Sequence, residues 1–262
     1  MNQIKLPQDL RSDLKTLGFY VVTAEKTENF SELADTVSIP SWPEFMLHDE
    51  VANKCWGSMV RNHPQFQFAL VDEKSGRWVA VGNSIPVRWD GEIEDLPDEG
   101  WDWAMTSGKE DTGWNIVSAI AIEIHPDMRG KRLSSIMIRI MRENAANHGF
   151  SKLIGPVRPN KKHEFPHMPM EEYIQKKNGD ELFDPWMRVH ARLGAKVVKV
   201  CHKAMRIPGT IEEWQKWTNR TFRKSGSYVI DMALVPINID VENDSGVYVE
   251  PNVWMVHTIK ED

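Results

Sequence analysis

The stretch from residue 116 to residue 149 constrains the fold most, because a strand, a basic turn and an amphipathic helix follow one another there. Alternating and β-branched apolar residues over 116–124 predict a buried strand. Pro126 ends that strand because proline has no amide hydrogen to donate to a neighbour. From Leu133 onward, apolar residues recur every three or four positions, which indicates a helix with one buried face. Gly149 is a typical end of a helix.

The turn between this strand and helix, residues 129–135, reads RGKRLSS. It combines free backbone amides, the positive end of a helix dipole and three cations, Arg129, Lys131 and Arg132. This combination favours the binding of a pyrophosphate. The alternative is an ordinary solvated turn, because basic turns before helices are common on protein surfaces.

Three segments, in this order, resemble the GNAT acyltransferase superfamily. Residues 125–131, HPDMRGK, are similar to its Arg/Gln-x-x-Gly-x-Gly/Ala loop, which binds coenzyme A. Residues 157–160, VRPN, resemble the family's next strand end, and residues 190–195, HARLGA, resemble its aromatic-x-x-x-Gly-Phe element. The resemblance covers roughly residues 19–207. It implies an α/β fold with a mixed, mostly antiparallel sheet flanked by helices, and transfer of an acyl group, with acetyl expected, from acyl-CoA to an amine.

The resemblance also implies where coenzyme A would bind. Backbone amides near Ile122 and Ile124 would hold its pantetheine arm, and Asn160 would hydrogen-bond the arm or serve only as a turn residue. Arg132 and Ser134 stand where the family has glycines, so the backbone approaches a phosphate less freely. Arg132 either contacts a phosphate with both guanidinium nitrogens or blocks the site. The expected contacts are Ile122, Ile124, Arg129, Gly130, Lys131, Arg132, Leu133, Ser134, Ser135 and Asn160.

Two residues are candidates for proton transfer. Glu123 lies in an otherwise apolar strand, and burial would raise its pKa toward the range that suits a general base. A glutamate near this point has that role in several members of the family. The alternative is an exposed or salt-bridged carboxylate. His190 stands where the resemblance places the tyrosine that protonates the departing thiolate, and histidine titrates near neutral pH. A purely structural histidine is the alternative.

No activated cysteine or serine nucleophile is evident, so we expect direct attack by the amine. Two alternatives remain open. One is acyl transfer to or from a carrier-protein thiol, as in polyketide-type assembly, and the other is a non-catalytic module that binds coenzyme A.

Two further patterns concern the acceptor side. Seven acidic residues lie between positions 90 and 102 with no basic residue among them, and they either form a solvated loop or attract a cationic acceptor. Trp101, Trp103 and Trp114 could line a substrate pocket or pack in the core. The stretch 163–167, HEFPH, matches a zinc-protease pattern, but Pro166 prevents the helix that this pattern requires.

Composition narrows the functional class. The two cysteines, Cys55 and Cys201, are too few for a disulfide framework or a cysteine-rich zinc site. The net charge of −6 argues against nucleic-acid binding. No leader or membrane-spanning stretch is evident, so we expect a cytoplasmic protein that needs no metal and acts on a small amine.

The chain is expected to form a core over residues 1–207, with insertions at about 90–113 and 161–184, and a β-rich extension over residues 208–262. Strand-like runs at 229–235 and 247–259 indicate that this extension is ordered. We expect it to pack on the exposed edge of the main sheet or across a homodimer, and to help cover the acceptor cleft. Outside the central strand and helix, the expected elements are strands at 18–24, 66–71, 78–87, 152–157 and 196–207, and helical stretches at 31–62 and 184–193.

Overall fold

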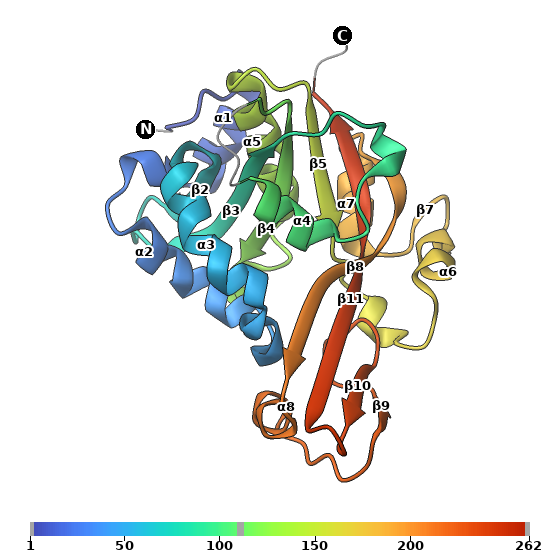
Figure 1. Ribbon diagram of the computed structural model, residues 1–262. Helices are drawn as coiled ribbons and strands as arrows, with labels where there is room; N and C mark the ends of the chain where they lie inside the picture. The colour runs from blue at the N-terminus through green and yellow to red at the C-terminus, as the bar shows by residue number, and fades with distance from the viewer. Residues whose placement is uncertain (1–2, 109–112, 260–262) are drawn as a thin grey trace.

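A nine-stranded sheet runs through the computed structural model, which describes residues 3–108 and 113–259 (Figure 1). The strands follow the order β1 (Phe19–Thr23), β2 (Gln67–Asp72), β3 (Trp78–Val87), β4 (Ile116–Ile124), β5 (Lys152–Val157), β11 (Ser245–Thr258), β10 (Ile237–Asp240) and β9 (Gly226–Tyr228), while β8 (Lys196–Gly209) also pairs with β11. The β4–β5 pair is parallel and the others are antiparallel. The mixed, mostly antiparallel sheet is confirmed.

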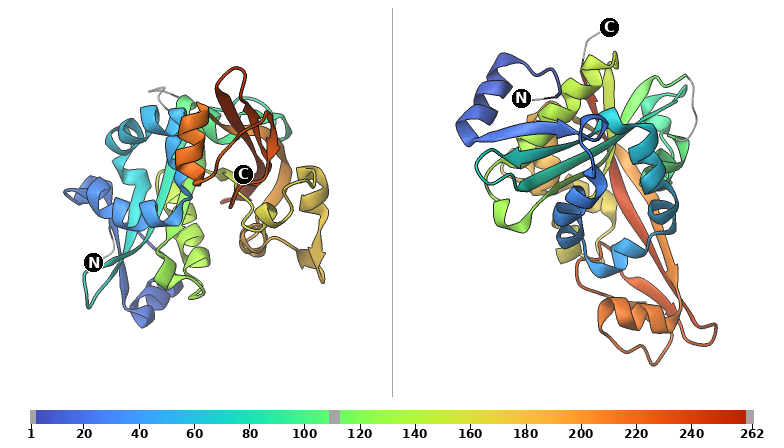
Figure 2. Two further views of the ribbon diagram at one scale, coloured as in Figure 1. Left: turned by 90° about the horizontal axis from the view of Figure 1, so that it is seen from below. Right: turned by 90° about the vertical axis from the view of Figure 1, so that its left-hand side faces the viewer.

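Helices cover both faces of the sheet (Figure 2). The α5 face carries α1 (Gln8–Leu17), α5 (Leu133–Asn147), α6 (Met170–Gln175) and α7 (Pro185–Arg192), and the α3 face carries α2 (Phe30–Ser38), α3 (Glu50–Asn62), α4 (Gly100–Ser107) and α8 (Ile211–Thr218). Short 3₁₀ turns are η1 (Ala24–Lys26), η2 (Ile39–Ser41), η3 (Glu44–His48), η4 (Pro64–Phe66), η5 (Ile93–Asp95), η6 (Pro126–Met128) and η7 (Lys162–Glu164). The apolar stripe of α5 is buried as its spacing predicted.

The β4 and β5 strands part soon after they meet. They pair at Val117 with Leu153 and at Ser118 with Ile154, and no later pair joins them. A side chain at Gly155 would meet the Cβ atom of Ala119 at 3.2 Å, so the strands are in close contact just before they separate. The expected separation near Pro156 is confirmed. The result is a gap whose β4 side ends at the basic turn.

The C-terminal strand lies inside the sheet. β11 pairs with β5 on one side and with β8 on the other, and the long β8–β11 pair extends away from β1–β5 to the end where β10 and β9 lie (Figure 1). The extension thus packs on the main sheet, with β11 between β5 and β8 and with β10 and β9 at the end of the strand order. An edge position for every added strand is not what the structure has, because β11 lies in the interior. The run at 247–259 is a strand, but 229–235 forms turns after β9.

Both insertions contain regular structure. Residues 90–113 hold η5 and α4, and of the seven acidic residues at 90–102 only Asp98 and Asp102 are partly buried. Residues 109–112 lie outside the described residues. Residues 161–184 hold η7, α6 and a small hairpin of β6 (Lys177–Asn178) and β7 (Glu181–Leu182). Because η7 ends at Glu164 and Phe165 has non-helical dihedral angles (φ −130°, ψ 56°), His163 and His167 do not share a helix, as Pro166 predicted.

Candidate active site

The edge of β4 that faces β5 is free beyond Ser118. The amide of His125 donates to the carbonyl of Val79 on β3 at 3.0 Å. Because successive backbone groups of a strand point to opposite sides, the amides of Ile122 and Ile124 face the gap. Among the described residues, neither amide has a backbone partner. These are the amides that the resemblance assigned to the pantetheine arm.

The basic turn leaves room for a ligand. Gly130 has a φ of +78°, and a Cβ atom placed there would meet no atom within 4 Å. Arg132 occupies the N-cap position of α5 with a φ of +60°, and no side chain caps the helix. The first amides of α5 therefore lack an intrahelical acceptor. Arg129, Lys131 and Arg132 are exposed, so the turn concentrates positive charge at the end of the free β4 edge.

Glu123 is buried on the α3 face of β4, with 4 % of its surface exposed. Ser38 donates its hydroxyl to Oε2 at 2.9 Å, and the indole of Trp42 donates to Oε1 at 2.6 Å. Burial raises the pKa of Glu123, while the two hydrogen bonds partly offset that rise. The carboxylate is thus fixed in position and made more basic, which suits a general base. The alternatives of an exposed or lysine-paired glutamate do not fit this position.

His190 is buried on the α5 face. Its Nδ1 lies 2.9 Å from Nε2 of His257, and its ring packs against Trp186. Burial lowers the pKa of His190 to about 3 and the pKa of His257 to about 4. At neutral pH both rings are neutral, so an imidazolium is not available at this position to protonate a thiolate. The general-acid role of His190 stays a prediction, and burial argues for a structural role.

The two candidate residues lie on opposite faces of the sheet. Glu123 is held by Ser38 and Trp42 from the α2 and η2 side. On β11 the side chain of His257 lies on the same face of the sheet as those of Val253 and Met255, because alternate residues of a strand share a face. Val253 and Met255 pack against α6 and α7 on that face. A joint role of Glu123 and His190 would therefore require a substrate that passes through the β4–β5 gap. Asn160 is exposed just after β5, and its side chain forms no hydrogen bond with residues 3–108 or 113–259.

The histidine pair should make the fold sensitive to acid. Their folded pKa values lie below the unfolded value of about 6.5, so the unfolded chain binds more protons as the pH falls below that value. Well below that pH, each histidine lowers the free energy of unfolding by about 1.4 kcal/mol for every further unit by which the pH falls. Between pH 6.5 and 5, His257→Gln should lose about 2 kcal/mol less than the wild type. Urea unfolding at both pH values measures this difference, and parallel losses would contradict it.

Two buried acids lie on the α3 face: Asp49, which sequence reasoning missed, and Asp102, which it included in the acidic run but did not single out. Asp49 caps α3 through Oδ1 and the amide of Ala52 at 2.7 Å, and it is fully buried. Asp102, in the first turn of α4, is partly buried. Burial and the charge of Asp49 raise the pKa of Asp102 to about 8. For Asp49 the sequence indicates only a helix N-cap. For Asp102 nothing in the sequence distinguishes it from the six other acids at 90–99.

A buried ion pair lies beside these acids at the end of β5. Arg158 donates through Nε to both oxygens of Glu250 at 3.0 Å, and the hydroxyl of Tyr248 donates to the same carboxylate at 2.7 Å. Glu250 is completely buried. The charge of Glu250 also raises the pKa of Asp49, which shows that the two carboxylates are close enough to interact. Arg158 belongs to the VRPN motif, which predicted no role for it. In the structure it neutralises the buried Glu250.

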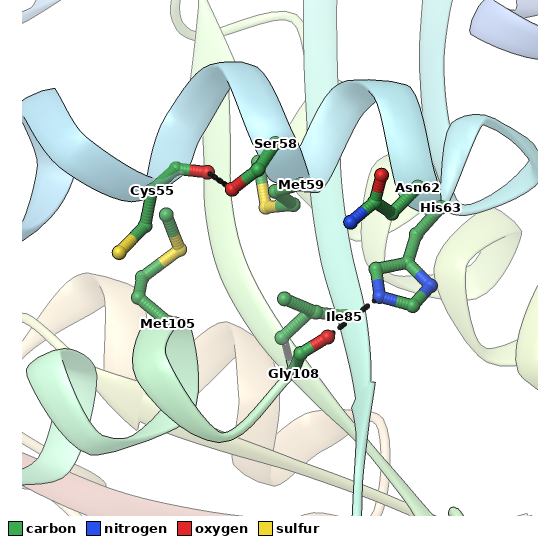
Figure 3. A pocket seen from close by; sticks show the side chains of 8 residues that line it. All are labelled: Cys55, Ser58, Met59, Asn62, His63, Ile85, Met105 and Gly108. Carbon is green, nitrogen blue, oxygen red and sulfur yellow. Dashed lines mark hydrogen bonds between the residues drawn. The ribbon is translucent and has the colours of Figure 1, made fainter. Parts of the chain in front are cut away.

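The α3 face of the described residues carries a crevice and a larger cavity. A narrow crevice between α3 and α4, lined by Cys55, Met59, His63, Met105 and Gly108 among others, has no room for a water molecule (Figure 3). A second cavity of about 140 Å³ lies between η3, the end of α8 and the loop at 230–232. Phe45 and Met232 line it, and Met232 accepts a hydrogen bond from Arg158. Through Met232 this cavity adjoins the Arg158–Glu250 ion pair.

Residues 3–108 and 113–259 contain no cluster of three metal-ligating side chains. Within the same residues, no helix combines the length and the apolar character needed to cross a membrane.

Comparison with known proteins gives one close relative in sequence. No family model matches the chain. The arginine N-acetyltransferase avaD of Aspergillus versicolor is 32% identical over 249 residues, which covers 83% of this chain and 85% of that protein.

Two solved structures share the fold. The loading GNATL domain of CurA from Lyngbya majuscula has a TM-score of 0.59 at 18% identity, and the match covers 92% of this chain and 98% of that one. The GphF GNAT-like decarboxylase in complex with isobutyryl-CoA also has a TM-score of 0.59, at 13% identity, and covers 92% and 99%.

Proposed function

Because the chain belongs to the GNAT superfamily of N-acetyltransferases, we propose that it transfers an acetyl group from acetyl-CoA to the amine of a cationic acceptor. The protein is an acyl-CoA-dependent N-acyltransferase, and the acetyl donor and the cationic acceptor are the proposed parts. Arginine is the first acceptor to test, because the related avaD is an arginine N-acetyltransferase. The observation that carries the proposal is the free edge of β4, which joins the basic turn to Glu123.

The chain's own residues would divide the work along this edge. The amides at the start of α5 and the cations of the turn would bind the pyrophosphate. Ile124 and Ile122 would hold the pantetheine arm as a neighbouring strand would. Glu123 would take the proton from the attacking amine, the amine nitrogen would bond to the acetyl carbon, and the thiolate would leave. Asn160 would hydrogen-bond the arm from the β5 side of the gap.

The two cysteines support transfer without a cysteine-bound acyl intermediate. Both are buried, and burial raises the pKa of Cys201 to about 12, so its thiolate is not available at neutral pH. Transfer to a carrier-protein thiol is the alternative acceptor chemistry. The two solved structures support the fold, but they do not favour either acceptor.

The proposal is tested by release of free coenzyme A thiol from a panel of acyl-CoAs with arginine, lysine and neutral amino acids. The proposal expects the fastest release with acetyl-CoA and a cationic amino acid. Release that requires a carrier protein and occurs with no free amine would contradict it.

Acetyl-CoA should stabilise the folded protein. Ligand at about a hundred times its dissociation constant adds roughly 2.7 kcal/mol to the free energy of unfolding. Thermal melts with and without acetyl-CoA measure the effect. An unchanged melting temperature at millimolar acetyl-CoA would leave the turn as a plain surface feature.

Arg132→Gly separates the two readings of this arginine. Glycine adopts the observed φ of +60° without strain, so the free variant should be no less stable than the wild type. If Arg132 contacts a phosphate, the affinity for acetyl-CoA should fall by about tenfold or more, the effect of losing a hydrogen bond to a charged group. Tighter binding would show that Arg132 blocks the site. Isothermal titration of both proteins with acetyl-CoA gives the answer.

A further inference from the structure

We propose that Asp49 and Asp102 bind the cationic group of the acceptor and thereby select a guanidinium or ammonium side chain over a neutral one. This inference rests on the proposed function, because it names the substrate class for the same reaction. The cation would lie between the N-terminal ends of α3 and α4, on the face of the sheet that carries Glu123.

The two helices bring these acids together. Cys55 of α3 lies beside Met105 of α4, and His63 further along α3 lies beside Gly108, so the helices run in the same direction (Figure 3). Their N-terminal ends therefore lie next to each other, and these ends carry Asp49 and Asp102. The charge of Asp49 raises the pKa of Asp102, as expected for neighbouring carboxylates.

Each carboxylate has a buried oxygen without a hydrogen-bond donor. Asp49 caps α3 with Oδ1, but its Oδ2 has no partner, and the residue is 0 % exposed. Oδ1 of Asp102 is likewise buried without a partner. Buried polar atoms are normally hydrogen-bonded, so two unmatched acceptors on the adjoining ends of α3 and α4 indicate a missing donor. A guanidinium carries five N–H donors and a positive charge, which match both oxygens.

The protein supplies no cation of its own to this pair. In the part of the chain that the structure describes, no lysine or arginine forms an ion pair with Asp49 or Asp102. The nearby Arg158 is already paired with Glu250. Because burial raises the pKa of both acids, Asp102 is mostly protonated at neutral pH in the free protein, and a bound cation would favour the ionised carboxylates.

The position of α4 connects this pair to the reaction. Trp101, the residue before Asp102, donates its indole N–H to the carbonyl of Ile120 at 3.0 Å. Ile120 lies at an irregularity of β4, three residues before Glu123. A long cationic side chain held by Asp102 could thus leave its own amine near the β4–β5 gap. Of the acidic run in this insertion, Asp102 is the residue that acts on the substrate, and the exposed acids form the solvated loop.

The test uses two charge-removing variants and a matched control. Asn at position 49 still caps a helix, so Asp49→Asn should keep α3 intact. Asp102→Asn removes a carboxylate whose pKa burial has raised, so the free variant should melt at the same or a higher temperature. Glu99→Gln removes an exposed charge one residue before α4 and serves as the control.

The expected result is a rise in the KM for L-arginine of about 10- to 150-fold in Asp49→Asn and Asp102→Asn, with the KM for acetyl-CoA unchanged. L-Arginine should raise the melting temperature of the wild type and of Glu99→Gln but not of the two variants. Neutral L-citrulline should have no effect on any of them.

Two outcomes separate this inference from the proposed function. If the wild type acetylates amines but both variants keep the wild-type KM for L-arginine, the acids do not bind the acceptor and only this inference fails. If the wild type acetylates no amine, the proposed function fails, and the melting shift with L-arginine alone decides whether the acids bind a cation.

Discussion

Glu123→Gln should lower turnover by about 10²–10⁴-fold, the usual loss when a general base is removed. Glutamine has nearly the same shape as glutamate. Its carbonyl oxygen can accept the hydrogen bond from the indole of Trp42, and its amide nitrogen can donate to the hydroxyl of Ser38. The fold should therefore be unharmed, and because burial raises the pKa of Glu123, removal of the charge should not reduce stability at neutral pH. Turnover at saturating acetyl-CoA and amine measures the loss.

The pH profile makes this test specific. The wild-type kcat/KM should fall as the pH drops through the raised pKa of Glu123, because only the carboxylate accepts the amine's proton. The Gln variant should lack this limb in its residual activity. Ser38→Ala is the matched control, since it removes one hydrogen bond and leaves the carboxylate, so its loss should be much smaller. Wild-type turnover in Glu123→Gln would remove this residue from the mechanism.

Truncation after Ile207 should abolish folding. It removes β11 from between β5 and β8, and with it the fully buried side chains of Tyr248, Val253 and Trp254. Each large apolar side chain contributes about 1.5–3 kcal/mol by burial, and a whole domain is stable by only about 5–15 kcal/mol. The fragment should be insoluble or lack a cooperative unfolding transition. A soluble, folded and fully active fragment would show that the tail is dispensable.

Point variants give a graded form of the same test. Trp254→Ala should cost about 3–5 kcal/mol, since it empties a buried site and removes the bond from the indole to the carbonyl of Pro97. Val229→Ala, at a side chain that is 38% exposed, should change stability by about 0.5 kcal/mol or less. Denaturant unfolding of both variants measures the contrast. Whether the tail also contacts a second copy of the chain stays a prediction for measurements of mass in solution.

Local signals in the sequence predicted the elements around the turn. The strand at 116–124 and the helix from Leu133 were evident because each has a clear period in its apolar residues and a Pro or Gly near its end. Pro156 predicted the parting of β5 from β4 because proline cannot donate to a ladder. In each case the information lies within a few residues of the element it specifies.

The place of β11 could not be predicted in this way. An apolar strand fits equally well at an edge and in the interior, and the choice depends on β5, some ninety residues earlier in the chain, leaving its other partner. The pairing of Asp49 with Asp102 was missed for a similar reason. These acids come together because α3 and α4 pack side by side, which no local pattern encodes. The helix that carries His190 was predicted from its local pattern, but the low pKa of His190 follows from burial beside His257, which is distant in the chain.

The central claim is direct transfer of acetyl from acetyl-CoA to the amine of a cationic acceptor. Mass spectrometry after incubation with acetyl-CoA labelled in the acetyl group and L-arginine tests it in one measurement. The account predicts arginine that carries one labelled acetyl group, together with an enzyme whose intact mass is unchanged at every time point. Unlabelled arginine in the presence of active protein, or a labelled acetyl group retained on the enzyme before transfer, would contradict it.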